Sequence, residues 1–301
     1  MRYFALTDLL GETERAPRVR TVKRKILEGD RLRLLLSGQR RDGGFGVHWY
    51  KKWAGATWRL VSAVDLGVPS DHEPARRAAV HVLSHLPGPR YEPRRIRGRT
   101  RVHASVVGNP LGVCARLGLA DDPRVAHIAH ALVRWQWPDG GWNCDSSPEA
   151  RHSSFYESLA PLWGLTEYLR VTGDGAVRPT IDRAAELFLR HRLYRSCRGE
   201  GVSDPRWMKL HYPLYWHYDF LQALRVVHAA GKLKDPRTAD ALDLLESKRS
   251  SDGTWPTESR FWRLGPVGAP NTEVVDWGAS GPNEMITLNA LRVLHAAGRL
   301  P

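Results

Sequence analysis

The chain has 301 residues and carries 45 Lys and Arg against 32 Asp and Glu, which gives a formal net charge of +13. Hydrophobic residues make up 42% of the sequence, which excludes a disordered chain and allows one sizeable core. The positive charge favours anionic partners but decides neither fold nor reaction. Twelve Trp against six Phe suit cavity walls as well as packed cores, because indole joins a large apolar face to one polar group.

The cysteines and the N-terminus indicate where the protein works. Cys114, Cys144 and Cys197 are widely spaced and form no Cys-x-x-Cys pair, which argues against a disulfide framework. Asp8 interrupts the apolar run that a signal peptide needs, and no apolar stretch is long enough to cross a bilayer. We therefore expect a soluble, cytoplasmic protein.

Three segments share a turn in which an Asp-Gly step is followed by an aromatic residue. In chain order they are 39–45, 136–142 and 249–255. Two further loops, near 87–89 and 198–201, fall between them. Turns therefore recur at intervals of about 50 residues, a period typical of helical-hairpin arrays.

The segments between the turns have helical periodicity. Residues 122–124 and 235–237, both Asp-Pro-Arg, read as helix starts. Segment 223–233 returns almost unchanged as 290–300, and each copy ends a helix at a Gly in the C-cap region. We expect about eleven helices and no convincing strand, in one all-α domain over residues 1–301. Apolar stripes on two of these helices comprise Val125, Ile128, Ala129, Leu132 and Val133, and Ile181, Ala184, Ala185, Phe188 and Leu189.

The turn at 136–142, Gln-Trp-Pro-Asp-Gly-Gly-Trp, resembles the Gln-Trp repeat of squalene–hopene cyclases, and the other two turns resemble weaker copies of it. Related Asp-Gly-Gly-aromatic turns occur in the β-subunits of protein prenyltransferases. The resemblance implies an α/α toroid of about five to six hairpins, in which inner helices surround a central cavity and outer helices surround the inner ones. It also implies that the helix after each such turn is an inner one.

The catalytic motifs of these families are absent. The sequence has no Asp-x-Asp-Asp, and its one acidic pair, Asp121-Asp122, precedes a Pro at a helix start. No Cys has an Asp two residues before it, as the zinc pair of prenyltransferases requires, and Cys144, Asp145 and His152 match no zinc spacing. P-loop, dinucleotide and nucleophile-elbow motifs are also missing. We expect no metal ion and no cofactor.

Polar and aromatic residues gather at the beginnings of the presumed inner helices, which in a toroid would converge on one mouth. Within 215–219, the spacing of Tyr215, Tyr218 and Asp219 predicts a shared helix face. Aromatic faces in such a mouth could stabilise a cation or stack on a planar ligand. The predicted ligand-binding residues are Trp49, Tyr50, Trp53, His103, Tyr156, His211, Tyr215, Trp216, Tyr218 and Asn283.

Four residues are candidates for acid–base catalysis: Glu157, His217, Asp219 and Glu284. Burial of Asp219 among aromatic rings would raise its pKa; the alternative is that it caps a helix or pairs with an Arg. His217 could equally be an ordinary core or surface histidine. Glu157 and Glu284 come early in their helices, where the helix dipole favours an acid whatever its role.

A run of arginines from Arg90 to Arg101 comes just before His103. Its guanidinium groups could bind a diphosphate or a nucleic-acid backbone; the alternative is a solvated loop. The predicted anion-binding residues are Arg94, Arg95, Arg97, Arg99 and Arg101.

Three functions remain open from the sequence. The first is an enzyme, or a descendant of one, that binds or processes an isoprenoid, a diphosphate-bearing or another hydrophobic ligand by acid–base chemistry in an aromatic cavity. The second is a nucleic-acid-binding helical repeat that accepts a base in an aromatic pocket. The third is a non-catalytic interaction scaffold.

Overall fold

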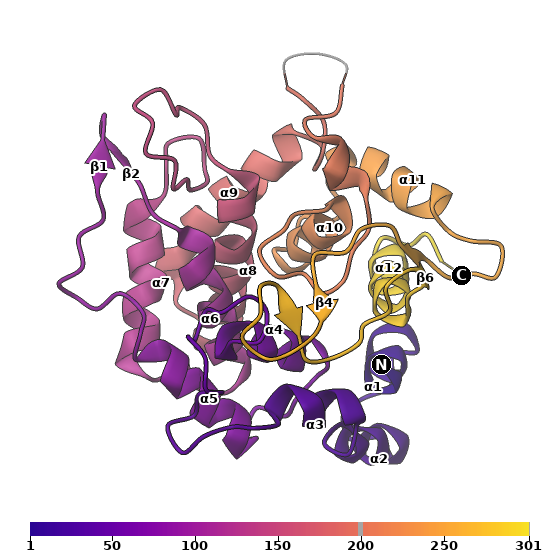
Figure 1. The fold of residues 1–301 in the computed structure, drawn as a ribbon. Coiled ribbons are helices and arrows are strands. Elements are labelled where there is room, and N and C mark those ends of the chain that lie inside the picture. The colour runs from indigo at the N-terminus through magenta and orange to yellow at the C-terminus, as the bar shows by residue number, and fades with distance from the viewer. Residues whose placement is uncertain (198–200, 301) are drawn as a thin grey trace.

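Helices dominate the computed structural model, which describes residues 1–197 and 201–300 (Figure 1). The predicted loop residues 198–200 lie outside the described residues. The described part contains twelve α-helices: α1 (Arg2–Phe4), α2 (Pro17–Ile26), α3 (Asp30–Leu36), α4 (Ala56–Asp65), α5 (Glu73–Leu83), α6 (Ala104–Arg116), α7 (Pro123–Trp135), α8 (Phe155–Thr172), α9 (Arg178–Arg190), α10 (Phe220–Ala229), α11 (Ala239–Ser247) and α12 (Glu284–Ala296).

Short elements complete the described part of the chain. The helical turns are η1 (Ala5–Leu9), η2 (Gly175–Val177), η3 (Pro205–Met208) and η4 (Pro236–Thr238). Six two-residue strands, which the sequence did not predict, pair within and between loops: β1 (Arg95–Ile96) with β2 (Arg99–Thr100), β3 (Pro256–Thr257) with β6 (Gly281–Pro282), and β4 (Arg263–Leu264) with β5 (Thr272–Glu273). The expectation of a mostly helical fold is confirmed.

The even-numbered helices from α4 to α12 pack against one another in sequence order, α4 on α6, α6 on α8, α8 on α10 and α10 on α12. The intervening helices lie beside them: α5 packs on both α4 and α6, and α7 on both α6 and α8. The turn η1 packs on α12, which brings the N-terminal segment beside the last helix (Figure 1). Among the described residues, no helix has the length and apolar character needed to span a bilayer.

Glutamine side chains join the first two Asp-Gly-aromatic turns to the helix that follows in the next hairpin. The amide nitrogen of Gln136 donates to the carbonyls of Gly140 and Thr180, and its oxygen accepts from Arg183 on α9. Gln39 repeats the arrangement, donating to Pro74 O and accepting from Arg77 on α5. One side chain thus links the backbone of its own turn to the start of a helix in the next hairpin.

The tryptophans of the second and third turns each form hydrogen bonds to the helix before the turn and to the helix after it. The indole N–H of Trp142 donates to Leu132 O on α7, and that of Trp255 donates to Leu245 O on α11. Both indoles are fully buried. The backbone N–H of each Trp also donates to a hydroxyl in the first turns of the next helix, Ser158 for Trp142 and Thr287 for Trp255. Each turn therefore fixes the helix before it to the helix that follows it.

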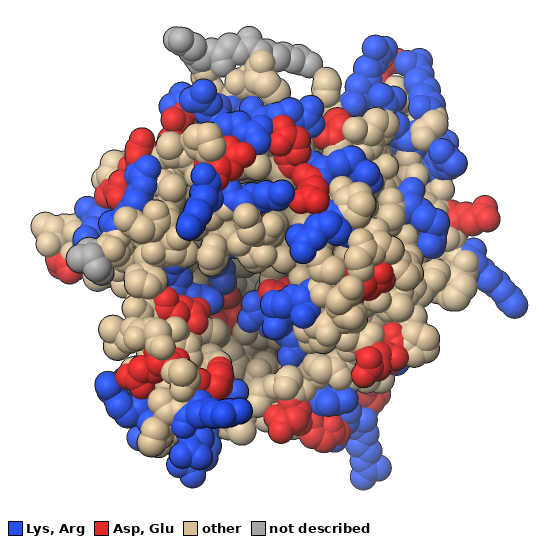
Figure 2. Space-filling model, turned by 180° about the vertical axis from the view of Figure 1, so that it is seen from behind, with Lys and Arg blue, Asp and Glu red and all other residues tan. Residues whose placement is uncertain are grey.

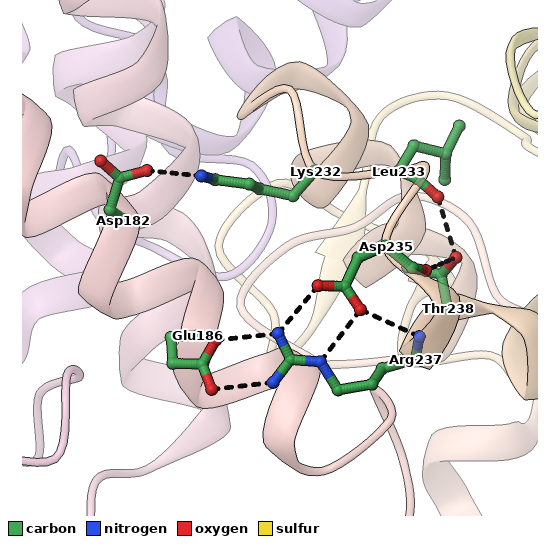
Figure 3. Close-up of polar contacts among 7 residues, drawn as sticks. All are labelled: Asp182, Glu186, Lys232, Leu233, Asp235, Arg237 and Thr238. Atoms are coloured by element: carbon green, nitrogen blue, oxygen red, sulfur yellow. Dashed lines mark hydrogen bonds and ion pairs between the residues drawn. The ribbon is translucent and has the colours of Figure 1, made fainter.

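Both predicted Asp-Pro-Arg segments begin a helical element with an Asp cap, and the second also ties two hairpins together (Figure 3). The Asp235 side chain accepts from Arg237 N at the start of η4. The Arg237 guanidinium then forks between Asp235 and Glu186 on α9, with nitrogen–oxygen distances of 2.8 and 3.0 Å to Glu186. Lys232 pairs with Asp182 one turn away on α9. Gly231 and Gly298 have positive φ just after α10 and α12, which confirms the predicted helix ends.

Helices α6 and α8 approach each other closely through glycines. A Cβ placed on Gly108 would lie 2.4 Å from Pro161 N, and a Cβ on Gly164 would lie 2.3 Å from Gly108 O. Neither neighbour is a flexible side-chain end, so the backbones would have to separate. These contacts set the distance between two helices that line the main cavity.

We predict that Gly108→Ala destabilises the protein by about 1–3 kcal/mol, because the added methyl group overpacks a backbone contact. Chemical unfolding followed by circular dichroism measures the change. Gly175→Ala is the matched control, since a Cβ there meets nothing within 4 Å. Equal stability of the two variants would show that the α6–α8 contact is not tightly constrained.

Candidate functional site

A cavity of about 400 Å³ lies between the even-numbered helices and the N-terminal segment. The helices that follow the three Asp-Gly-aromatic turns, α4, α8 and α12, all contribute to its wall. The face shown in Figure 2 is hollowed, and the hollow contains both basic and acidic side chains. The lining residues are Phe4, Asp8, Val61, Val64, Asp65, Asn109, Arg116, Tyr156, Leu159, Ala160, Trp163, Glu167, Leu214, Tyr215, Trp216, His217, Gln222, Arg225, Val226, His228, Ala229, Arg292, Val293 and Ala296.

Stacked aromatic rings form one end of the cavity, just before α10. His217 stacks between Trp216 and Phe261, with ring centroids 4.2 and 3.5 Å away. Tyr215 stacks on the fully buried Trp53 at 3.7 Å, and its hydroxyl donates to Glu273 on β5. The rings thus close this end with apolar faces that are held by the loop between α11 and α12.

Three ion pairs line the cavity toward the later turns of the helices. Arg225 on α10 pairs with Asp65 at the end of α4, and Arg292 on α12 pairs with Asp8 on η1 at 2.6 Å. Arg116, the last residue of α6, pairs with Glu167 on α8, also at 2.6 Å. Each pair joins two different elements around the cavity. Cations near helix C-termini are also favoured by the helix dipole.

The arginines keep the cavity carboxylates ionised. Burial opposes ionisation of Asp65, but Arg225 and Arg292 outweigh it and hold its pKa below the usual value. Burial likewise opposes ionisation of Glu167, whose pKa Arg116 and Arg170 nevertheless lower. A carboxylate held in its charged form is a poor proton donor. Asp65 and Glu167 are therefore unsuited to protonating an alkene.

His217 is the predicted catalytic residue that lines the cavity. Burial lowers its pKa to about 3, and the nearby His211 and Lys52 charges act in the same direction. Its Nδ1 atom is buried without a hydrogen-bond partner. The ring is therefore neutral near pH 7, where it can form a hydrogen bond to a ligand but is a weak base.

Only some of the residues predicted at the helix beginnings line this cavity. Of the predicted ligand-binding residues, Tyr156, Tyr215 and Trp216 line the cavity. Trp53 is buried behind Tyr215 and borders a separate cleft with Trp216 and His217. The loop between α11 and α12 packs on the segments before α4 and α10: the Trp53 indole donates to Phe261 O, and His217 stacks on the Phe261 ring.

The predicted shared face of Tyr215, Tyr218 and Asp219 is wrong, because α10 begins only at Phe220. The Asp219 carboxylate accepts from Gln222 N at 2.8 Å as a helix cap and contacts His211 Nδ1 at 2.8 Å. Both side chains are almost fully buried outside the cavity wall. Tyr218 donates its hydroxyl to Leu193 O in the core. These groups hold the start of α10 in place.

Two predicted residues at the start of α12 also cap and pair. The Asn283 side chain accepts from Met285 N and Ile286 N, each at 3.0 Å. Glu284 is half exposed and pairs with Arg31. Neither residue lines the cavity.

Glu157, His103 and Tyr50 form a separate group at the starts of α6 and α8. Glu157 is buried and accepts from Ser105 N at 2.9 Å and from His103 Nδ1 at 3.2 Å. Burial opposes its ionisation, but these hydrogen bonds lower its pKa. The Cys144 thiol lies beside it, and burial and the Glu157 charge raise the pKa of this thiol to about 12. Tyr50 packs on Trp58 nearby, and Trp49 stacks on His85.

The arginine run divides into structural and exposed members. Arg101 is buried, lies over Trp137 and donates to the carbonyls of Ser147 and Ala150. Arg97 pairs with Glu149, and Arg99 also lies over Trp137. Arg94 and Arg95 are exposed at the β1–β2 hairpin, which projects from the body of the protein (Figure 1). Arg101 is therefore not available to the predicted anion site, because its guanidinium binds carbonyl groups of the loop that follows Trp142.

The sequence did not single out the charged residues of the cavity, although one signal was available. Arg225 and Arg292 occupy the same position in the two copies of the Ala-Leu-Arg-Val repeat. An arginine repeated inside an otherwise apolar helical stretch indicates a buried, paired cation. No repeated sequence pattern of this kind marked the other charged residues Asp65, Arg116 and Glu167.

We predict that His217→Phe weakens the pH dependence of stability. Between about pH 3 and about pH 6.5, unfolded histidine binds a proton that the folded ring does not. The free energy of unfolding of the wild type therefore decreases as the pH is lowered through this window. When the pH is lowered from about 7 to about 5, the free energy of unfolding should decrease by up to about 2 kcal/mol less in the variant than in the wild type. Urea unfolding at both pH values measures this, with the exposed His295→Gln as control. An unchanged pH dependence would contradict a buried, neutral His217.

Comparison with known proteins gives only remote likenesses. No protein-family model matches the sequence, and no curated protein matches it. The chain is similar to the crystal structure of a protein from Actinoplanes, with 16% identity and a TM-score of 0.44 over 92% of this chain and 88% of that chain. It is also similar to the type II terpene cyclase MstE from Scytonema, with 14% identity and a TM-score of 0.34 over 94% and 100% of the two chains. These values are too low to establish the family of the chain.

Proposed function

We propose that the chain is a single α/α toroid of the terpenoid cyclase type and that it binds a hydrophobic, isoprenoid-like ligand in its central cavity. The three Asp-Gly-aromatic turns and the sequential packing of α4, α6, α8, α10 and α12 support the toroid. The cavity itself carries the functional part of the proposal. Its volume of about 400 Å³ falls within the range of small-molecule sites.

The chemistry of the wall favours a ligand that is mainly apolar and uncharged. Trp163, Tyr156, Leu159 and Trp216 offer aromatic and aliphatic faces, which also suit developing positive charge. The three cavity arginines are each paired with a carboxylate. A diphosphate group would have to approach those carboxylates, so the ion pairs disfavour it. A hydroxyl or carbonyl group fits this end better.

The geometry supports binding more directly than acid-initiated cyclisation. Asp219 and Glu284 do not reach the cavity, and the pKa values of Asp65 and Glu167 are lowered. Acid–base chemistry in this proposal would rest on His217, which is neutral and lies on the wall. The alternative of a non-catalytic scaffold shares the fold but requires no ligand.

A cavity-filling variant tests the proposal. Ala229 is on the cavity wall and exposed to it, so that Ala229→Trp should occupy the space without overpacking the core. We predict that geranylgeraniol, titrated against tryptophan fluorescence, binds the wild type and binds the variant at least about tenfold more weakly. Ala176→Trp, at an exposed position on η2, is the matched control. Equal binding by all three proteins would place the ligand elsewhere.

Extraction of the purified wild-type protein provides an independent readout. Organic extraction followed by mass spectrometry should recover a lipid-like molecule from the wild type and less of it from Ala229→Trp. An oligonucleotide in place of a lipid would argue for the second candidate function.

The second candidate is nucleic-acid binding, and the projecting hairpin favours it. Arg94 and Arg95 are exposed beside Tyr91, whose side chain is also exposed; such a surface can contact phosphates and stack on a base. We predict that Arg94→Gln/Arg95→Gln lowers the salt dependence of single-stranded DNA binding by about 1.4 in the log–log slope, since each phosphate contact contributes about 0.7. Arg41→Gln/Arg178→Gln, at two other exposed positions, is the control. Fluorescence anisotropy that detects no salt-dependent binding in the wild type would exclude this candidate.

A further inference from the structure

Three side chains with metal-ligating atoms meet at the N-terminal ends of α6 and α8. His103 precedes the first residue of α6, Glu157 is in the first turn of α8, and Cys144 follows the turn that ends at Trp142. One ligand atom from each lies within 4.8 Å of the other two. None of the three lines the central cavity.

We propose that His103, Cys144 and Glu157 bind one zinc ion and leave its fourth position open. Zinc lies about 2.3 Å from a thiolate and about 2.0–2.2 Å from imidazole or carboxylate atoms. In a tetrahedral site the donor atoms therefore lie about 3.3–3.6 Å apart; His103 Nδ1 and Glu157 Oε1 are already 3.2 Å apart, and side-chain rotation would bring the rest of the set, now within 4.8 Å, closer. A mixed sulfur, nitrogen and oxygen set suits zinc better than magnesium or calcium, which prefer oxygen alone.

The surroundings hold these ligands as a metal site requires. The backbone N–H of Ser105 donates to Glu157 Oε2 at 2.9 Å, so the carboxylate is oriented by a rigid helix end while its other oxygen faces His103. Oriented outer contacts of this kind fix the geometry of first ligands. Burial differs across the site: Glu157 is buried, whereas the His103 side chain is 72% exposed.

The exposed side of the site gives the ion an entry path and leaves room for a water molecule. Three protein ligands and an open position are typical of zinc that polarises a bound group, whereas structural zinc has four protein ligands.

This set differs from the one that the sequence brought to attention. Asp145 and His152, the neighbours of Cys144 in the chain, are not part of it; the Asp145 carboxylate instead accepts from Ser147 N at 2.8 Å. The ligands come from segments far apart in the sequence, which the packing of α6 on α8 and the hydrogen bond from Val102 N to Asn143 O bring together. The proposal is independent of what the central cavity binds.

Cobalt substitution in a Cys197→Ser background tests the site. In full-length Cys197→Ser protein, the remaining thiols are Cys144 and the buried Cys114. After dialysis against a chelator, titration with Co²⁺ should give a thiolate-to-cobalt charge-transfer band and the strong visible bands of four-coordinate cobalt, saturating at one ion per chain. Zinc added afterwards should abolish both.

Three ligand variants in the same background identify the donors. Cys144→Ser should remove the charge-transfer band, and Glu157→Gln and His103→Ala should each weaken binding by more than about tenfold. His85→Ala, which changes an exposed histidine outside the set, should leave binding unchanged. Circular dichroism of each variant separates loss of the site from loss of the fold.

The wild-type spectrum alone can overturn the proposal, even where a variant fails to fold. Absence of stoichiometric cobalt or zinc binding would show that the three side chains form only a hydrogen-bonded cluster. Binding without a thiolate band, or a band that persists in folded Cys144→Ser protein, would place the metal elsewhere.

Discussion

The fold depends on side chains that satisfy backbone groups at the joints between hairpins. Gln136 bridges its own turn to the start of α9, and Trp142 joins the end of α7 to the second turn of α8. Unpaired carbonyl and amide groups at helix ends are costly to bury. By using one side chain for two helix ends, each turn fixes the direction of the next cavity-lining helix. The third turn keeps the Trp255 contacts but has Arg249 where the others have Gln.

The cavity between the helices has two chemically different ends. Aromatic residues close the end where the inter-hairpin loops meet, and ion pairs such as Asp65–Arg225 lie toward the other. A buried charge is tolerated when a partner compensates its desolvation. The pairs therefore connect distant helices while leaving the cavity near electrical neutrality. A mainly apolar ligand with a small polar group matches this distribution better than a highly charged one.

The helix beginnings serve mainly to anchor the chain. Asp219 and Asn283 cap α10 and α12, and His211 contacts the first of these caps. Glu157 differs because its carboxylate lies beside His103 and Cys144 from other segments. The same chemical types thus have different roles, which depend on what packs opposite them. A capping carboxylate is satisfied locally, whereas Glu157 belongs to a cluster that a cation would hold together.

The sequence by itself determined the helical class, the repeated turns, the Asp-Pro-Arg starts and the Gly231 and Gly298 helix ends. These depend on contacts within a few residues or on a pattern that recurs along the chain. Tertiary structure alone decided which polar groups meet. The loop between α11 and α12 packs on His217 before α10, Asp65 meets Arg225, and Cys144 meets His103. Such pairs join segments far apart in the sequence, so their distance is set by helix packing, which no local pattern encodes.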